Sequence, residues 1–141
     1  MKMTLENLSN IARDIIKKAH DQKSDSAIVI ALEGDLGAGK TTLTQEIARV
    51  LFIKERVISP TFIIMKKYEA IDEKFKYLIH IDAYRLEKSE ELFKLGFQKL
   101  LEDKDNLIII EWPENVPDCI PKNAIRVKLS HEIDNSHSIE F

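Results

Sequence analysis

The feature that most constrains this chain is a glycine-rich segment, Gly34–Thr41, which reads Gly-Asp-Leu-Gly-Ala-Gly-Lys-Thr. The segment matches the pattern G-x-x-x-x-G-K-S/T, in which a loop of backbone N–H groups surrounds the phosphates of a nucleotide. Side chains would block the phosphate oxygens from such a loop, and three of the chain's four glycines lie in it. We therefore expect the chain to bind a nucleoside triphosphate, with ATP as the first candidate.

The sequence on either side of the loop is what this chemistry requires. Residues Ala27–Leu32 are continuously apolar, which is typical of a strand covered on both faces. Residues from about Lys40 to Phe52 carry apolar side chains on one side, which predicts a helix whose N-terminus faces the phosphates. Lys40 is expected to contact the β- and γ-phosphates, and the Thr41 hydroxyl to bind Mg²⁺. The nucleotide-binding residues predicted from this region are Gly34, Asp35, Leu36, Gly37, Ala38, Gly39, Lys40, Thr41 and Thr42.

Helices and strands are predicted to alternate over the rest of the chain. Apolar residues with helical spacing cover Leu5–Lys18, for which Thr4 is the predicted cap, and a charged helix is predicted over Ser89–Leu101. The strand-like segments are Thr61–Tyr68, Lys76–Ile81, Leu107–Ile110, Ile125–Leu129 and Ser138–Phe141. Strands separated by helices favour parallel pairing, whereas the first two of these segments predict a hairpin. We expect an α/β fold of the P-loop NTPase kind in one domain over residues 1–141, a three-layer sandwich whose mixed, partly parallel sheet is flanked by helices.

Two acidic residues end predicted strands and are candidates for the chemistry. Asp82 follows Tyr77–Ile81, and Glu111 follows Leu107–Ile110. Because ligands of parallel α/β sheets lie outside the carboxyl ends of the strands, both side chains are expected to face the phosphates. One would hold Mg²⁺ or its water shell, and the other would orient or deprotonate the attacking water. The alternative for either residue is a helix cap or a turn, and the residues alone do not say which acid binds the metal.

Three further features have an ordinary as well as a functional interpretation. The segment Ser59–Phe62 reads as a turn, but it lies where switch-type NTPases place a hydroxyl that senses the γ-phosphate and Mg²⁺. Trp112 could stack on a base or a partner, although a lone tryptophan is more often half-buried core. His80 alternates with apolar neighbours and reads as a sheet residue whose hydrogen bonds are satisfied.

Composition narrows the class of protein. The formal net charge of −3 is unlike that of a protein that holds nucleic acid by itself, so any RNA is expected to be held mainly by a partner. The apolar runs are too short for a membrane span, and Met1–Leu8 lacks the apolar stretch of a secretory signal. The single cysteine, Cys119, cannot form an internal disulfide and is interpreted as a bystander. We expect a cytoplasmic protein.

Taken together, the motifs resemble those of the TsaE family, formerly YjeE, small bacterial ATPases of tRNA threonylcarbamoyladenosine synthesis. The glycine-rich segment is shared by many families, so the specificity of the resemblance comes from the later blocks and from their order and spacing over nearly the whole chain. Ala83 departs from the larger apolar residue that is common in the family. The matching blocks are Gly34–Thr42, Val57–Phe62, His80–Leu86, Glu91–Phe97 and Ile110–Glu114.

This resemblance implies a role in modifying adenosine 37 of tRNAs that read ANN codons. Family members bind and slowly hydrolyse ATP, and they act with TsaB and TsaD proteins, of which TsaD carries the transfer chemistry. Hydrolysis would reset that complex between turnovers, and tRNA would be contacted indirectly.

The resemblance also implies residue roles. Thr41 and Glu111 would hold Mg²⁺, and Lys40 would hold the phosphates. Asp82 would serve hydrolysis with Thr61 as the switch hydroxyl. Trp112 would lie near the nucleotide or the partner surface.

The alternatives are a small-molecule kinase, a GTPase-type switch, and a subunit that binds ATP without turning it over. A kinase usually closes an arginine-bearing lid, and no late arginine cluster occurs here. A GTPase usually carries an Asn/Thr-Lys-x-Asp segment, which is also absent. The sequence does not separate slow turnover from binding alone.

Overall fold

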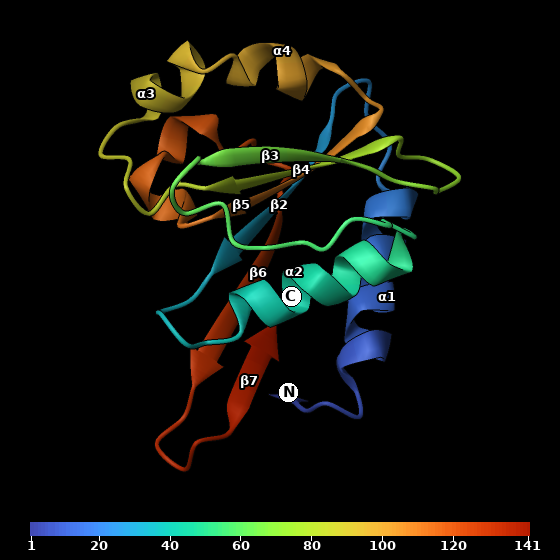
Figure 1. The fold of residues 1–141 in the computed structure, drawn as a ribbon, viewed down its shortest axis with the longest axis vertical. Helices are drawn as coiled ribbons and strands as arrows, with labels where there is room; N and C mark the ends of the chain where they lie inside the picture. Colours follow the sequence, from blue (N-terminus) through green and yellow to red (C-terminus); the bar gives the residue numbers. More distant parts are fainter.

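The computed structural model describes residues 1–141, and its seven strands form one mixed sheet (Figure 1). The order across the sheet is β1-β7-β6-β2-β5-β4-β3. The central strands β6, β2, β5 and β4 are parallel, whereas β3, β7 and β1 pair antiparallel at the two edges. The strands are β1 Lys2–Met3, β2 Ile28–Glu33, β3 Met65–Glu69, β4 Tyr77–Asp82, β5 Asn106–Glu111, β6 Ile125–His131 and β7 His137–Glu140. The predicted α/β fold with a mixed, partly parallel sheet is confirmed.

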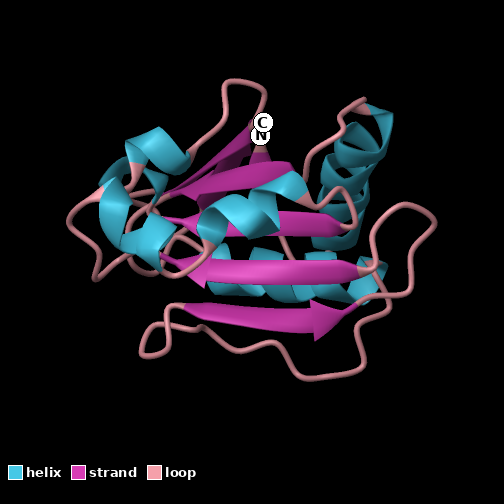
Figure 2. Cartoon of the chain, turned by 90° about the horizontal axis from the view of Figure 1, so that it is seen from above, coloured by secondary structure: helices cyan, strands magenta, loops and turns pink.

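Helices cover both faces of this sheet (Figures 1 and 2). The long helices α1 and α2 lie on one face, and the short helices α3 and α4 lie on the other. Two 3-10 turns, η1 and η2, follow β5. The helical bounds are α1 Leu8–Asp21, α2 Lys40–Val50, α3 Ser89–Lys94, α4 Phe97–Glu102, η1 Pro113–Asn115 and η2 Pro117–Cys119.

The central strands are buried on both faces because their side chains alternate between two cores. On β2, Ile28, Ile30 and Leu32 pack with α1 and α2. Val29, between them, packs on the opposite side with the residues of α3 and α4. This arrangement confirms the covered strand that the continuous apolar run predicted.

The first helix begins three residues later than its apolar spacing predicted. Thr4 and Asn7 exchange hydrogen bonds, Thr4 N to Asn7 Oδ1 at 2.7 Å and Asn7 N to Thr4 Oγ1 at 3.2 Å. This closed turn leaves Leu5 89% exposed and makes Asn7, not Thr4, the residue that precedes the helix. The prediction of Thr4 as the cap was therefore wrong.

Two other predicted elements are shorter or divided. The charged helix predicted over Ser89–Leu101 is broken at Gly96, whose φ of +92° is left-handed and ends α3 before α4 begins. The strand predicted from Thr61 begins only at Met65, because Pro60–Ile64 forms a turn in which Ile64 N donates to Pro60 O at 2.6 Å. No helix of the chain combines the length and the apolar character that crossing a membrane would require.

Candidate nucleotide site

The glycine-rich segment forms the loop that joins β2 to α2. Gly34, Gly37 and Gly39 all have positive φ, at +153°, +82° and +102°. At Gly34 a side chain is also excluded by space, because an added Cβ would lie 2.9 Å from the backbone oxygen of Leu129 on β6. Gly39 precedes α2 and offers no side-chain cap, so no side chain caps the first N–H groups of the helix, which begins where the loop ends.

A cavity of about 360 Å³ opens beside this loop, at the carboxyl ends of β4 and β5. Most of the residues singled out from the sequence line it, and the loop, the segment after α2 and two strand ends contribute them. They are Asp35, Leu36, Gly37, Gly39, Lys40, Thr41, Thr42, Ser59, Thr61, Asp82, Glu111 and Trp112. Gly34 and Ala38 belong to the same loop but do not line the cavity, and Ala38 is almost completely buried.

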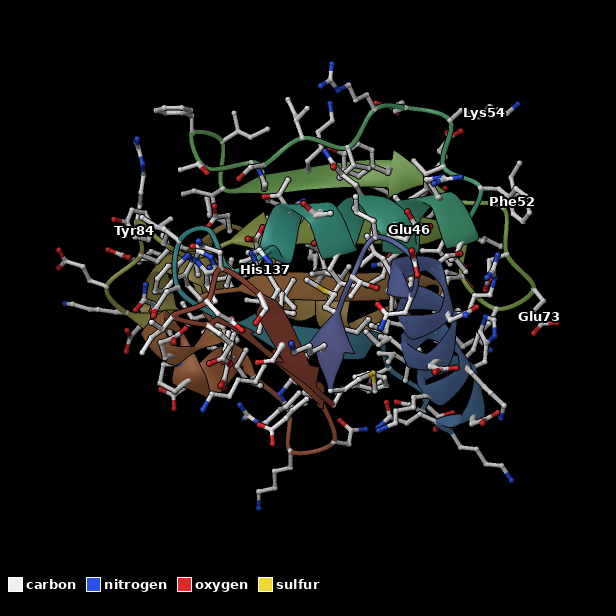
Figure 3. The ribbon with its side chains drawn as sticks, turned by 90° about the horizontal axis from the view of Figure 1, so that it is seen from below. Glu46, Phe52, Lys54, Glu73, Tyr84 and His137 are labelled. Atoms are coloured by element: carbon white, nitrogen blue, oxygen red, sulfur yellow. The ribbon has the colours of Figure 1, made fainter.

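Two lining residues were not identified from the sequence as site residues, Tyr84 and His137. Figure 3 shows both at the end of the molecule where α2 begins. Tyr84 follows Asp82 by two positions, and that proximity was an available signal. His137 Nε2 is 3.1 Å from the oxygen of Gly37, but this contact depends on the pairing of β7 with β6, which no local pattern reveals.

The Lys40 side chain is buried and points back across the loop. Its Nζ donates to the carbonyl oxygen of Gly34, and to that of Asp35 at 3.2 Å. It also lies 4.3 Å from the ring centroid of Trp112. Burial lowers the pKa of Lys40 below its ordinary value, and the nearby carboxylate of Glu111 opposes this shift.

Asp82 is connected to the segment that follows α2. Its Oδ2 accepts from the Thr61 hydroxyl at 2.9 Å and from the Ser59 hydroxyl at 3.5 Å, and the two hydroxyl oxygens are 2.8 Å apart. Its Oδ1 accepts from Tyr84 N at 3.0 Å. The predicted switch segment, Ser59–Phe62, runs into the turn Pro60–Ile64, and its two hydroxyls contact an acid of the site.

Glu111 lies directly beside Asp82, because the two are register partners on β5 and β4. Its Oε2 is 2.6 Å from His80 Nε2, and both side chains are buried. No cluster of three or more His, Cys, Asp or Glu side chains forms a complete metal cage. Mg²⁺ is usually held by one or two protein oxygens together with waters and substrate phosphates. The Thr41 hydroxyl and the Glu111 carboxylate, both at the cavity, are such hard oxygen donors.

Trp112 adopts an unusual backbone conformation immediately after Glu111. Its φ of +57° is left-handed, and the residue precedes η1, which begins with Pro113. Its ring packs against Tyr84, with centroids 5.2 Å apart and an interplanar angle of 55°. The turn after β5 thus places the Trp112 ring at the cavity, between Lys40 and Tyr84.

Comparisons with known proteins agree with the motif set. The family model described as threonylcarbamoyl adenosine biosynthesis protein TsaE matches residues 3–139. The chain is 35% identical over 128 residues to the TsaE protein of Haemophilus influenzae, covering 91% of this chain and 76% of that protein. It is 39% identical over 116 residues to the TsaE protein of a Nostoc species, covering 80% and 68% of the two chains.

A solved structure gives the same result at the level of the fold. YdiB of Bacillus subtilis superposes with a TM-score of 0.70 at 27% sequence identity, over 97% of this chain and 78% of that chain. The TsaE protein of Bacillus subtilis is 34% identical over 113 residues. Since the family model spans almost the whole sequence and the matched relatives are covered over most of their length, this chain belongs to the TsaE family of tRNA threonylcarbamoyladenosine biosynthesis proteins.

Proposed function

We propose that this protein binds ATP with Mg²⁺ at the glycine-rich loop and hydrolyses it slowly as an accessory subunit of tRNA threonylcarbamoyladenosine synthesis. One observation carries the proposal: Lys40, Thr41, Asp82 and Glu111 converge on a single cavity. These groups come from the start of a helix and from two adjacent strand ends. They supply a cation, a hydroxyl and two carboxylates beside a loop of glycines, which is the donor set that a P-loop nucleotide site uses.

The loop would bind the triphosphate mainly through backbone N–H groups and the N-terminus of α2. Lys40 would leave the carbonyl oxygens of Gly34 and Asp35 and turn to the β- and γ-phosphates. Thr41 and Glu111 would hold Mg²⁺, which supplies charge neutralisation on the phosphate oxygens.

Asp82 and Thr61 would act on the other side of the γ-phosphate. Asp82 already holds the Thr61 hydroxyl at 2.9 Å, so a water that replaced this hydroxyl would meet a fixed acceptor. In this role Asp82 orients the water and accepts its proton, and Thr61 reports whether the γ-phosphate is present.

A second, more apolar cavity of about 240 Å³ adjoins the first and shares Gly39, Thr42 and His137 with it. Its other walls are Met3, Thr4, Leu5 and Leu8 from the N-terminal segment. Because Thr42 follows the residues proposed for the β- and γ-phosphates, the nucleoside would leave the loop on this side. The adenine base would therefore lie between the N-terminal segment and the His137 ring.

The tRNA would be held by TsaB- and TsaD-type partner proteins rather than by this chain. The net charge of −3 supports this division, since direct binding of nucleic acid depends on a basic surface. ATP hydrolysis would then reset the partner complex between turnovers in the cytoplasm.

The decisive test has two levels. First, Lys40→Ala should abolish ATP binding measured by isothermal titration calorimetry, whereas an affinity like that of the wild type would refute the role of the loop. Second, a multiple-turnover tRNA modification assay with purified partner proteins should depend on this protein and fail with Lys40→Ala. Modification that proceeds without it would refute the accessory role and leave the nucleotide site intact.

A further inference from the structure

We propose that His80 is the positioning residue of the metal ligand, and that it holds the Glu111 carboxylate so that one oxygen alone faces the cavity. The inference rests on the proposed function, because it takes Glu111 as the Mg²⁺ ligand. It adds a residue that does not line the cavity and is completely buried, so that it acts through Glu111.

Strand alternation brings the two side chains together. On β4, Ile79 and Ile81 pack with α3 and α4, so His80 between them faces α2. On β5, Ile110 packs on the α3 side, so Glu111 after it also faces α2. The two side chains therefore meet beneath the cavity.

The contact is short, buried and exclusive. His80 is 0% exposed and Glu111 is 3% exposed, and Nε2 lies 2.6 Å from Oε2. The other ring nitrogen, Nδ1, is buried and has no hydrogen-bond partner, so Glu111 is the only partner of the ring. The carboxylate is an acceptor at this pair, and His80 Nε2–H is the donor.

In this geometry the two carboxylate oxygens of Glu111 have different roles. Oε2 is occupied by His80, and Oε1 is left for the cavity that Glu111 lines. Side chains that ligate metals are commonly held by such an outer hydrogen bond, and loss of that bond weakens metal binding. His80 would thus preset the ligand oxygen before Mg²⁺ arrives, and it would do so from the hydrophobic core.

Two substitutions of His80 by amide side chains distinguish this positioning role from simple packing, because each amide replaces a different ring nitrogen. His80→Gln places its amide N–H near the position of Nε2 and keeps a donor for Glu111. His80→Asn places its amide near the position of Nδ1 and leaves Glu111 without a donor. Both variants replace the same buried side chain by an amide, and only the place of the amide differs. They therefore form a matched pair.

The probe is Mn²⁺ with ADP, followed by electron paramagnetic resonance, which needs no turnover. We expect His80→Asn to weaken Mn²⁺ binding about ten- to hundredfold and His80→Gln to stay close to the wild type. Metal-free ADP binding in EDTA should be unchanged in both. In a Glu111→Gln background, His80→Asn should cause no further loss of Mn²⁺ binding.

Several outcomes would overturn the inference. Wild-type Mn²⁺ affinity in His80→Asn, equal losses in both variants, or a loss of the same size in the Glu111→Gln background would each show that His80 does not position the ligand. If His80→Asn does not fold, as judged by circular dichroism, while His80→Gln folds but binds Mn²⁺ weakly, the inference is also refuted. Failure of the proposed function looks different, since the wild type itself would then bind no Mn²⁺ with ADP.

Discussion

Replacement of Gly34 by alanine tests how the loop is built. The residue has a φ of +153°, and its Cβ would lie 2.9 Å from Leu129 O and 3.1 Å from the Cβ of Ala38. The first contact cannot relax cheaply, because Leu129 belongs to β6, which is paired with β7 on one side and with β2 on the other. The substitution must therefore move the loop rather than its neighbours.

The cost has two parts. A non-glycine residue in a disfavoured backbone region costs about 1–3 kcal/mol. Forcing a methyl group into closely packed surroundings adds about 1–3 kcal/mol. We therefore expect Gly34→Ala to lower the free energy of unfolding by about 2–6 kcal/mol and to weaken ATP binding strongly.

Gly96→Ala is the matched control, because Gly96 also has a left-handed φ, +92°, but no atom lies within 4 Å of the added Cβ. It pays a backbone cost of about 1–2 kcal/mol, partly offset by the lower entropy of the unfolded chain. Urea unfolding without nucleotide gives both free energies, and calorimetry gives the ATP affinities. Equal destabilisation by the two variants, or normal ATP affinity in Gly34→Ala, would refute the steric argument.

Three other predictions concern the site and the contact between His20 of α1 and Asp72, which lies in the turn before β4. Asp82→Asn should retain ATP affinity but reduce hydrolysis at least tenfold, about 1.4 kcal/mol in the barrier, and wild-type turnover would contradict its role. Nucleotide binding should change the fluorescence of Trp112, the only tryptophan, because Lys40 leaves its ring; an unchanged spectrum at saturation would contradict this motion. Burial raises the pKa of Asp72, but hydrogen bonds from two backbone N–H groups and from His20 outweigh it, so the pKa lies below its ordinary value of 3.8. Its stabilisation is complete above pH 3.8 and is lost as the pH falls through the lower folded pKa, so Asp72→Asn should flatten the acid limb of urea unfolding, which an unaltered limb would disprove.

The part of the fold nearest the loop could be predicted because its signals are local. A continuous apolar strand, a glycine-rich turn and an amphipathic helix each specify themselves within a few residues, and β2 and α2 lie where they were expected. The boundaries failed where a local hydrogen bond or a backbone angle overrode periodicity. Thr4 and Asn7 closed a turn before α1, and Gly96 divided a helix whose apolar pattern runs through it.

The candidate site could be predicted wherever its residues sit at strand ends. Asp82 and Glu111 were both expected to face the phosphates, from the rule that ligands lie outside the carboxyl ends of parallel strands. The register places the two side by side. His137 could not be found in this way, because β7 returns antiparallel to β6 and brings it to Gly37 from 100 residues away in the sequence. Contacts of that kind are set by sheet topology rather than by any local pattern.

The two acids, equivalent in sequence, differ in what holds them. Asp82 accepts hydrogen bonds from the hydroxyls of Ser59 and Thr61, which lie in a segment whose Phe62 is 83% exposed. Glu111 accepts from His80, which is enclosed by the core. A ligand that must stay fixed while metal and nucleotide exchange is better held by a rigid strand residue, whereas a group that responds to the γ-phosphate needs partners that can move. This difference in surroundings supports our proposal that Glu111 is the metal ligand and Asp82 the hydrolytic acid, an assignment that the strand pattern alone left open.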